Sequence, residues 1–220
     1  MAAKRVVLTG YEPWAHAAEN PTIELLDRAR ERNIPDVELI TIRVPVETNK
    51  ITPLVDEALD EYQPDIWISL GLYQGLSVIG VERTAANVKD FPVADNLGAK
   101  PHDETVFADG PFAYQATLPI KAIVKEMADR AIPAKVSNSA STYLCNQIMY
   151  SALHLTKQKK LSTRAGFIHV PCSPAYVAAA DYPEHELPSM SIDLMELAVD
   201  AAVTTAANSL ADIKAPPKGY

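Results

Sequence analysis

The chain has 220 residues, of which 48% are hydrophobic and 22% are charged, and its formal net charge is −8. It contains no polar tract or internal repeat that would indicate disorder or a solenoid, and no apolar run long enough to cross a bilayer. The 20 basic residues are scattered, which argues against nucleic acid or an anionic lipid surface as the partner. We therefore expect one globular domain, residues 1–220, that acts on a small molecule.

The first third of the chain alternates between strand-like and helix-like patterns. A β-branched run at residues 6–10 ends in glycine, and Asn20-Pro21 combines an N-cap residue with a proline at the first helical position. One face of a later helix collects Ile51, Leu54, Val55, Ala58 and Leu59. The expected elements are a strand at 6–10, a helix from residue 21, a strand at 37–44, a helix at 47–62 and a strand at 65–71.

The rest of the chain opens with a long stretch, residues 72–118, that is rich in polar turns. A structureless loop of this length is uncommon in a compact domain, so we expect strands around 77–87 and substrate-facing turns elsewhere. A helix at 119–131 should turn Ile120, Ile123, Val124 and Met127 inward. The last expected elements are a helix at 143–155, a strand at 164–170, a helix at 191–210 and a frayed tail at 214–220.

This alternation predicts an α/β fold. We expect a single-domain, twisted, mixed but largely parallel sheet with helices on both faces, as in phosphorylase-like and hydrolase-like α/β/α sandwiches. Such open sheets bind ligands beyond the carboxyl ends of their strands, and the order of elements places Gly10, Gly71, Cys145 and His169 at such ends. Residues 1–5 lead directly into the first strand without the apolar core of a signal peptide, so we expect a cytoplasmic protein.

Cys145 follows a strand-like segment and begins a helix-like one. A thiol attacks as the thiolate, and the free N–H groups of a first helical turn favour that form. The alternative is a small buried apolar side chain, the usual fate of an isolated cysteine. With Cys172 as its only companion, no disulfide framework is expected. We interpret Cys145 as the candidate nucleophile and Cys172 as a structural residue or one that supports the catalytic residues without reacting.

His169 and Glu82 are the candidate partners of this thiol. His169 ends a predicted strand and can act as a general base, although a histidine in an apolar strand can equally be a hydrogen-bonded core residue. Glu82 can orient the imidazole, or form an ion pair with a nearby arginine. His169 and Cys172 fall short of the four ligands of a structural zinc site, so we predict no metal. A thiol, an imidazole and a carboxylate are together able to cleave amides.

Five segments of the chain carry motifs that occur together in one family. They are residues 6–14, 82–87, 95–98, 139–146 and 166–171. They resemble, in order, the opening Gly-Phe-x-Pro-Phe loop, the Glu-Arg-x-Ala-x-Asn motif, the Asp-Asn-x-Gly turn, the nucleophile motif and the histidine motif of the pyroglutamyl peptidase I (pyrrolidone-carboxylate peptidase) family of cysteine peptidases. The resemblance extends over residues 5–210 and implies removal of an N-terminal pyroglutamyl group, a five-membered lactam, through a thioester.

The resemblance also implies roles for individual residues. Cys145 is the nucleophile, His169 the general base and then acid, and Glu82 the residue that orients the imidazole. No metal or cofactor is implied, and because relatives are often homo-oligomers we expect a dimer or tetramer. The expected substrate-binding residues, among them three aromatic rings suited to a flat lactam, are Tyr11, Trp14, Asn20, Leu72, Gln74, Tyr143 and Leu144.

Several positions depart from the family pattern. Leu72 stands where the family usually has a glutamine that hydrogen-bonds in the pocket, and Gln74-Gly75-Leu76 replaces Gly-Gly-Arg. Pro92 replaces an arginine, and Ser141 and Ala15-His16 replace glycines. A site that loses a hydrogen bond to its substrate loses discrimination. The same triad could therefore act on a different lactam or N-acyl amide, with Gln74 compensating from a shifted loop.

Two further interpretations stay open from the sequence. The chain could be a non-catalytic homologue that uses the same cleft to bind a ligand, although an intact triad argues against this. Alternatively, Cys145 could be a redox-sensing thiol, which would require Cys172 to lie close enough to resolve a sulfenate at Cys145.

Overall fold

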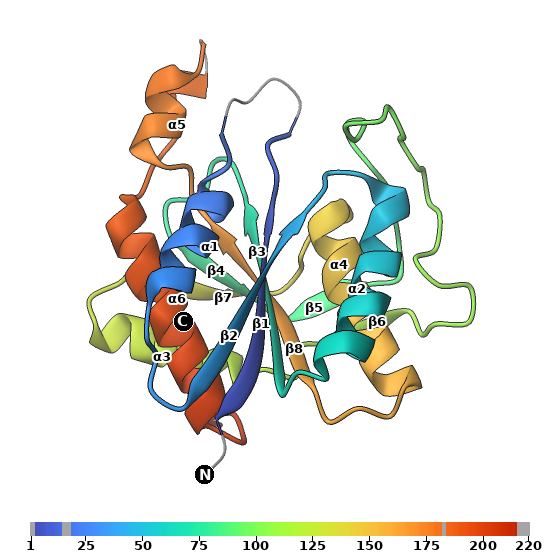
Figure 1. Ribbon diagram of the computed structural model, residues 1–220. Helices are drawn as coiled ribbons and strands as arrows, with labels where there is room; N and C mark the ends of the chain where they lie inside the picture. Colours follow the sequence, from blue (N-terminus) through green and yellow to red (C-terminus); the bar gives the residue numbers. More distant parts are fainter. Residues whose placement is uncertain (1–2, 15–18, 182–183, 215–220) are drawn as a thin grey trace.

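A six-stranded sheet forms the centre of the molecule in this computed structural model, which describes residues 3–14, 19–181 and 184–214 (Figure 1). The order of strands is β2-β1-β3-β8-β4-β7. The strands are β1 (Lys4–Tyr11), β2 (Val37–Val44), β3 (Ile66–Leu72), β4 (Ile79–Glu82), β7 (Ala134–Ser137) and β8 (Arg164–Val170). A second, two-stranded sheet pairs β5 (Thr84–Ala86) with β6 (Ala113–Gln115). Ala15-His16 and residues 215–220 of the predicted frayed tail lie outside the described residues.

The direction of the strands confirms the predicted mixed, largely parallel sheet. Neighbours among β2, β1, β3 and β8 are parallel, whereas β4 is antiparallel to β8 and parallel to β7. The antiparallel pair places Gly80 directly opposite His169. Because side chains two residues apart in a strand share a face, Glu82 lies on the same face as Gly80, diagonally across from His169.

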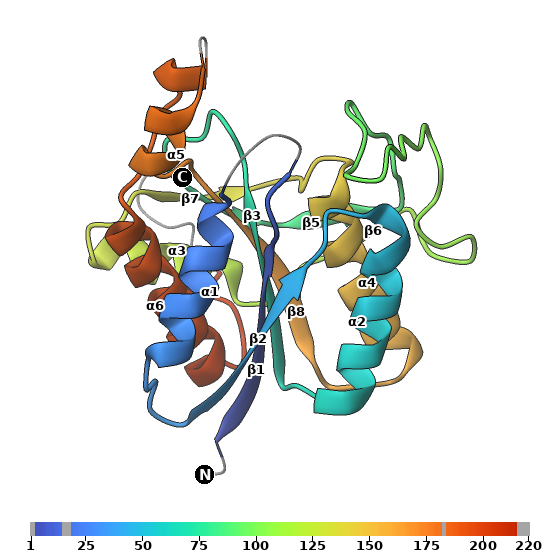
Figure 2. The same ribbon diagram turned by 45° about the horizontal axis from the view of Figure 1, so that its top comes forward.

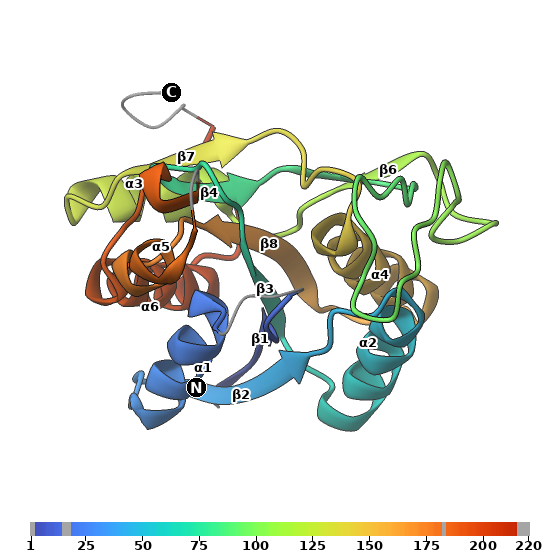
Figure 3. The ribbon, with the colours of Figure 1, turned by 90° about the horizontal axis from the view of Figure 1, so that it is seen from above.

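Helices cover both faces of the sheet, as Figures 1 and 3 show. The helices are α1 (Pro21–Glu31), α3 (Ile120–Asp129) and α6 (Ile192–Asn208) on one face, and α2 (Thr48–Tyr62) and α4 (Leu144–Gln158) on the other. The alternation of side chains along β1 follows this division, since Val6 and Leu8 belong to the apolar cluster under α1, α3 and α6, and Val7 belongs to the cluster under α2 and α4. The chain is thus a single α/β domain.

Most elements begin and end within three residues of their predicted bounds, because their apolar periodicity is strong. The N-cap prediction at Asn20 is confirmed, since its Oδ1 accepts a hydrogen bond from the Thr22 amide at 3.0 Å. The strands expected around residues 77–87 are β4 and β5. Three short elements were not predicted: β6, α5 (Pro174–Ala179) and the 3-10 helix η1 (Glu184–Glu186).

The segment between β5 and β6 has little regular structure and is held by side chains instead. The Asn87 carboxamide oxygen accepts from the Val106 and Phe107 amides, at 2.9 and 3.0 Å. The Asp95 carboxylate accepts from Thr48, the first residue of α2, at 2.8 Å. The Asp95 bond attaches the segment to the start of α2, and Figure 2 shows the segment beside α2 and α4.

Candidate active site

Cys145 is the second residue of α4, so the predicted position at a helix start is confirmed. The N-cap residue Tyr143 makes no side-chain capping bond, and the first bond of the helix runs from the Gln147 amide to the Tyr143 carbonyl. The N–H groups of Leu144, Cys145 and Asn146 therefore lie ahead of the first helical hydrogen bond. This end of the helix favours negative charge on the sulfur and on an oxyanion beside it.

His169 and Glu82 form a buried pair. The Nδ1 atom of His169 lies 2.7 Å from Oε1 of Glu82, and each side chain is only 2% exposed. The imidazole stands opposite two glycines, Gly71 in β3 and Gly80 in β4, which leave space on the two neighbouring strands. The second carboxylate oxygen of Glu82, Oε2, is buried and has no hydrogen-bond partner among the described residues.

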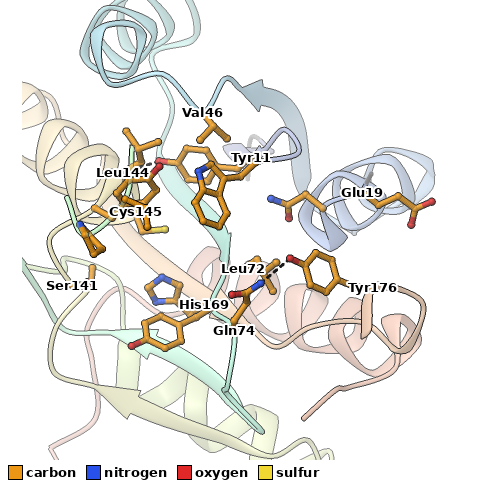
Figure 4. A pocket seen from close by; sticks show the side chains of 17 residues that line it. Tyr11, Glu19, Val46, Leu72, Gln74, Ser141, Leu144, Cys145, His169 and Tyr176 are labelled. Atoms are coloured by element: carbon orange, nitrogen blue, oxygen red, sulfur yellow. Dashed lines mark hydrogen bonds between the residues drawn. The ribbon is translucent and has the colours of Figure 1, made fainter. Parts of the chain in front are cut away.

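Cys145 and His169 face each other across one end of a pocket, with the sulfur pointing toward the imidazole in Figure 4. Burial alone would lower the pKa of His169, but the Cys145 sulfur and the Glu82 carboxylate outweigh burial and raise that pKa to about 9. The imidazole is therefore protonated at neutral pH. With Nδ1 bonded to Glu82, Nε2 is the nitrogen left for the sulfur and for a substrate.

The pocket has a volume of about 360 Å³ and contains the predicted binding residues. All seven of them line it: Tyr11, Trp14, Asn20, Leu72, Gln74, Tyr143 and Leu144. Cys145 and His169 line it as well, whereas Glu82 lies behind the imidazole. Sequence positions far apart thus meet at the carboxyl ends of β1, β3 and β8.

The aromatic side chains of the pocket are fixed by their polar ends. The Tyr11 hydroxyl donates to the Leu144 carbonyl at 2.7 Å, and the Tyr143 hydroxyl donates to the Ala94 carbonyl at 3.2 Å. Burial raises the pKa of both hydroxyls, that of Tyr143 to about 12, so both remain donors. The rings of Trp14 and Tyr143 meet edge to face, with centroids 6.3 Å apart.

Sequence reasoning missed some of the lining. Val46 lies between β2 and α2 and Val93 between β5 and β6; both line the pocket, and neither carries a sequence signal of its own. Tyr176 enters from α5, whose start has a readable signal: Ser173 caps the helix by accepting from the Tyr176 amide at 3.0 Å, and Pro174 follows at the first helical position.

Cys172 stands apart from the pocket. It is fully buried and does not line the cavity, and burial raises the pKa of its thiol.

Within the described ranges we find no cluster of three or more histidine, cysteine or acidic side chains that could bind a metal. Over the same ranges, no helix combines the length and apolar content needed to span a membrane.

The sequence of this chain matches a known protein family. The family model for pyroglutamyl peptidase matches residues 4–209 of the chain. The chain belongs to the pyroglutamyl peptidase family. Among similar members, the pyrrolidone-carboxylate peptidase of Clostridium perfringens is 39% identical over 203 residues, which cover 90% of this chain and 93% of that protein.

Solved structures of family members share the fold. The pyrrolidone carboxyl peptidase from Thermococcus litoralis superposes with a TM-score of 0.91 at 38% identity, covering 97% of this chain and 99% of that one. The pyroglutamyl peptidase I from Bacillus amyloliquefaciens also gives a TM-score of 0.91, at 33% identity with the same coverage. The predicted family and fold are therefore confirmed.

Proposed function

We propose that this protein hydrolyses the amide bond that follows an N-terminal pyroglutamyl group, with Cys145 as nucleophile, His169 as base and acid, and Glu82 as the residue that orients the imidazole. One observation carries the proposal. In a family of pyroglutamyl peptidases, this chain holds a thiol at a helix N-terminus facing an imidazole whose other nitrogen is bonded to a buried carboxylate. A non-catalytic binding homologue would not need this arrangement.

The reaction follows from the geometry. The Cys145 thiolate attacks the acyl carbon and forms a C–S bond, while the N–H groups at the start of α4 stabilise the oxyanion. The C–N bond then breaks as the protonated Nε2 of His169 gives its proton to the leaving amine. His169 next takes a proton from water, whose oxygen attacks the thioester carbon. The C–S bond then breaks, the acid leaves, and Cys145 returns as the thiolate beside protonated His169. Throughout, Glu82 stabilises the imidazolium through Nδ1.

The test uses the pyroglutamyl amide of a fluorescent amine. We expect the wild-type protein to release the amine, and Cys145→Ala and His169→Ala each to lower kcat/KM by at least about a thousandfold, because members of a catalytic triad act as a unit. Cys172→Ala is the control and should retain activity. Iodoacetamide near neutral pH should label Cys145 much faster than the buried Cys172. Full activity in Cys145→Ala would contradict the mechanism.

We also propose that the protein is a cytoplasmic homo-oligomer, a dimer or a tetramer. The oligomeric state is supported by the family resemblance and by exposed apolar side chains on the segment between β5 and β6, where Leu97 is 64% and Phe112 97% exposed. The two free cysteines suit a reducing compartment.

A further inference from the structure

The aromatic side chains of the pocket present the faces of their rings to a substrate, but few free polar atoms. The Tyr11 hydroxyl is bonded to the Leu144 carbonyl, and the Trp14 indole N–H and the Tyr143 hydroxyl both donate to the Ala94 carbonyl, at 3.3 and 3.2 Å. These donors are directed into the protein. What the walls present to a ligand is mainly carbon.

Other parts of the lining are apolar as well. Val46, Leu72, Pro92 and Val93 all border the cavity. A five-membered lactam brings one N–H donor and one carbonyl acceptor into this space. Enclosing the N–H without a partner would lose the hydrogen bond that it made to water, which is unfavourable. A pocket that selects a lactam therefore needs an acceptor beside the aromatic walls.

Gln74 can supply that acceptor. It is the second residue of a turn in which the Leu76 amide donates to the Tyr73 carbonyl at 3.3 Å. Gly75, the third residue, has a φ of +89°, the positive value that a type II turn requires there. Of the two carboxamides among the described lining residues, Asn20 already accepts from the Thr22 amide through Oδ1. The Gln74 oxygen has no such described donor.

Tyr176 determines which way the Gln74 carboxamide points. The Gln74 Nε2 atom donates to the Tyr176 hydroxyl at 2.8 Å, and Tyr176 is itself fixed at the start of α5 by the Ser173 cap. Since the amide nitrogen is turned toward α5, the carboxamide oxygen faces the other way. Figure 4 shows that oxygen on the side of Cys145 and His169.

We propose that Oε1 of Gln74 accepts the ring N–H of the acyl group, and that Tyr176 is a positioning residue that holds the carboxamide in this orientation. The inference rests on the proposed function and specifies its substrate class: small acyl rings with an N–H bonded to the carbon that bears the reacting carbonyl. Gln74 lies in the turn after β3 and Tyr176 in α5, so the hydrogen bond between them joins two separate segments that line the pocket.

The experiment compares two amides of the same fluorescent amine. One carries the pyroglutamyl group, and the other carries a 3-oxocyclopentanecarbonyl group, in which a CH2 replaces the ring N–H while the ring carbonyl is kept. The measured quantity is the ratio of the two kcat/KM values. A folding defect or altered triad chemistry lowers both values alike, whereas loss of an acceptor for the N–H lowers only the pyroglutamyl value.

The wild-type protein should prefer the pyroglutamyl amide. Gln74→Ala should lower kcat/KM for that substrate about three- to tenfold, as expected for one hydrogen bond made by an exposed side chain, and change the other less than about twofold. Gln74→Glu should keep the preference, because a carboxylate still presents an acceptor to the pocket while its second oxygen accepts from Tyr176.

Tyr176→Phe should weaken the preference through KM, with kcat nearly unchanged. Gln158→Ala, an exposed glutamine at the far end of α4, is the matched control.

Three outcomes overturn the inference while the proposed function stands: equal wild-type activity on both amides, an equal loss on both in Gln74→Ala, or loss of the preference in Gln74→Glu. The last would mean that the amide N–H of Gln74 faces the ring. If the wild-type protein cleaves neither amide, the proposed function is wrong and the inference falls with it.

Discussion

Glu82 acts on the reaction through His169, because its carboxylate is bonded to the imidazole. Its carboxylate is one of the groups that raise the pKa of His169 to about 9. The imidazolium that supports a thiolate is therefore present below about pH 9 and is lost as pH rises through that value. The pH dependence of kcat/KM reports this ionisation in the free enzyme.

Replacing Glu82 by glutamine should move the alkaline limb of the kcat/KM profile to lower pH and reduce the maximum by about a hundredfold or more, because the imidazolium loses its carboxylate partner. The profile of the wild-type enzyme, measured alongside, should fall near pH 9. The new amide group would occupy the buried position of Oε2, so the thermal midpoint is measured as the control for folding. An alkaline limb that does not move would show that Glu82 does not act on the imidazole.

The two glycines opposite His169 provide a matched pair of variants. A methyl group on Gly71 would lie 2.5 Å from the Phe167 ring and 2.9 Å from the Cys145 sulfur, so one of them must move. A methyl group on Gly80 would meet its neighbours at 3.5 Å or more, which is ordinary contact. Gly71→Ala should therefore lower kcat/KM about a hundredfold by displacing the nucleophile, and Gly80→Ala far less. Similar losses in the two variants would argue against this placement of the sulfur.

Helix α4 both carries the nucleophile and fixes the segment that borders the pocket. Asn146, one residue after Cys145, is fully buried. Its oxygen accepts from the Ala86 amide at 2.8 Å, and its nitrogen donates to the Ala86 and Val88 carbonyls at 2.9 and 2.8 Å. One side chain thus connects the start of α4 to β5 and to the chain that follows it.

Asn146→Ala should destabilise the protein by about 3 kcal/mol, because it leaves several backbone groups without a partner in the interior. For a chain of this size that corresponds to a decrease in thermal midpoint of about 6–12 °C, measurable by circular dichroism. Gln158→Ala, on the exposed end of the same helix, should change the midpoint by less than about 2 °C. Equal midpoints for the two variants would mean that the connection contributes little.

How far the sequence could predict this structure depends on the element. Helices α2, α3 and α6 follow from apolar periodicity, and β2 and β8 have the predicted bounds. The three-residue β6 has no buried residue to give an alternating pattern, and α5 has six residues and none buried. The sequence identified Glu82 and His169 as candidates, but their meeting depends on the antiparallel pairing of β4 with β8, which a run of four residues does not reveal.

The exposed apolar side chains are unevenly distributed over the surface of the molecule. Of the six large ones among the described residues, three lie on the segment between β5 and β6: Val93, Leu97 and Phe112. Phe112 is 97% exposed, and burying a phenylalanine fully is favourable by about 1.5–3 kcal/mol. Association of two or more copies through this segment would bury that surface, which is the physical basis for expecting an oligomer.

Light scattering at micromolar concentration should accordingly give a mass that is a multiple of 23.9 kDa. Phe112→Asp should shift the mass toward a single chain, because a carboxylate in an apolar interface is unfavourable unless it is paired. Leu210→Asp is the matched control: Leu210 is 84% exposed but follows α6, away from this segment, so the variant should keep the wild-type mass. A wild-type mass of 23.9 kDa would contradict the oligomer, and an unchanged mass in Phe112→Asp would place the interface elsewhere on the surface.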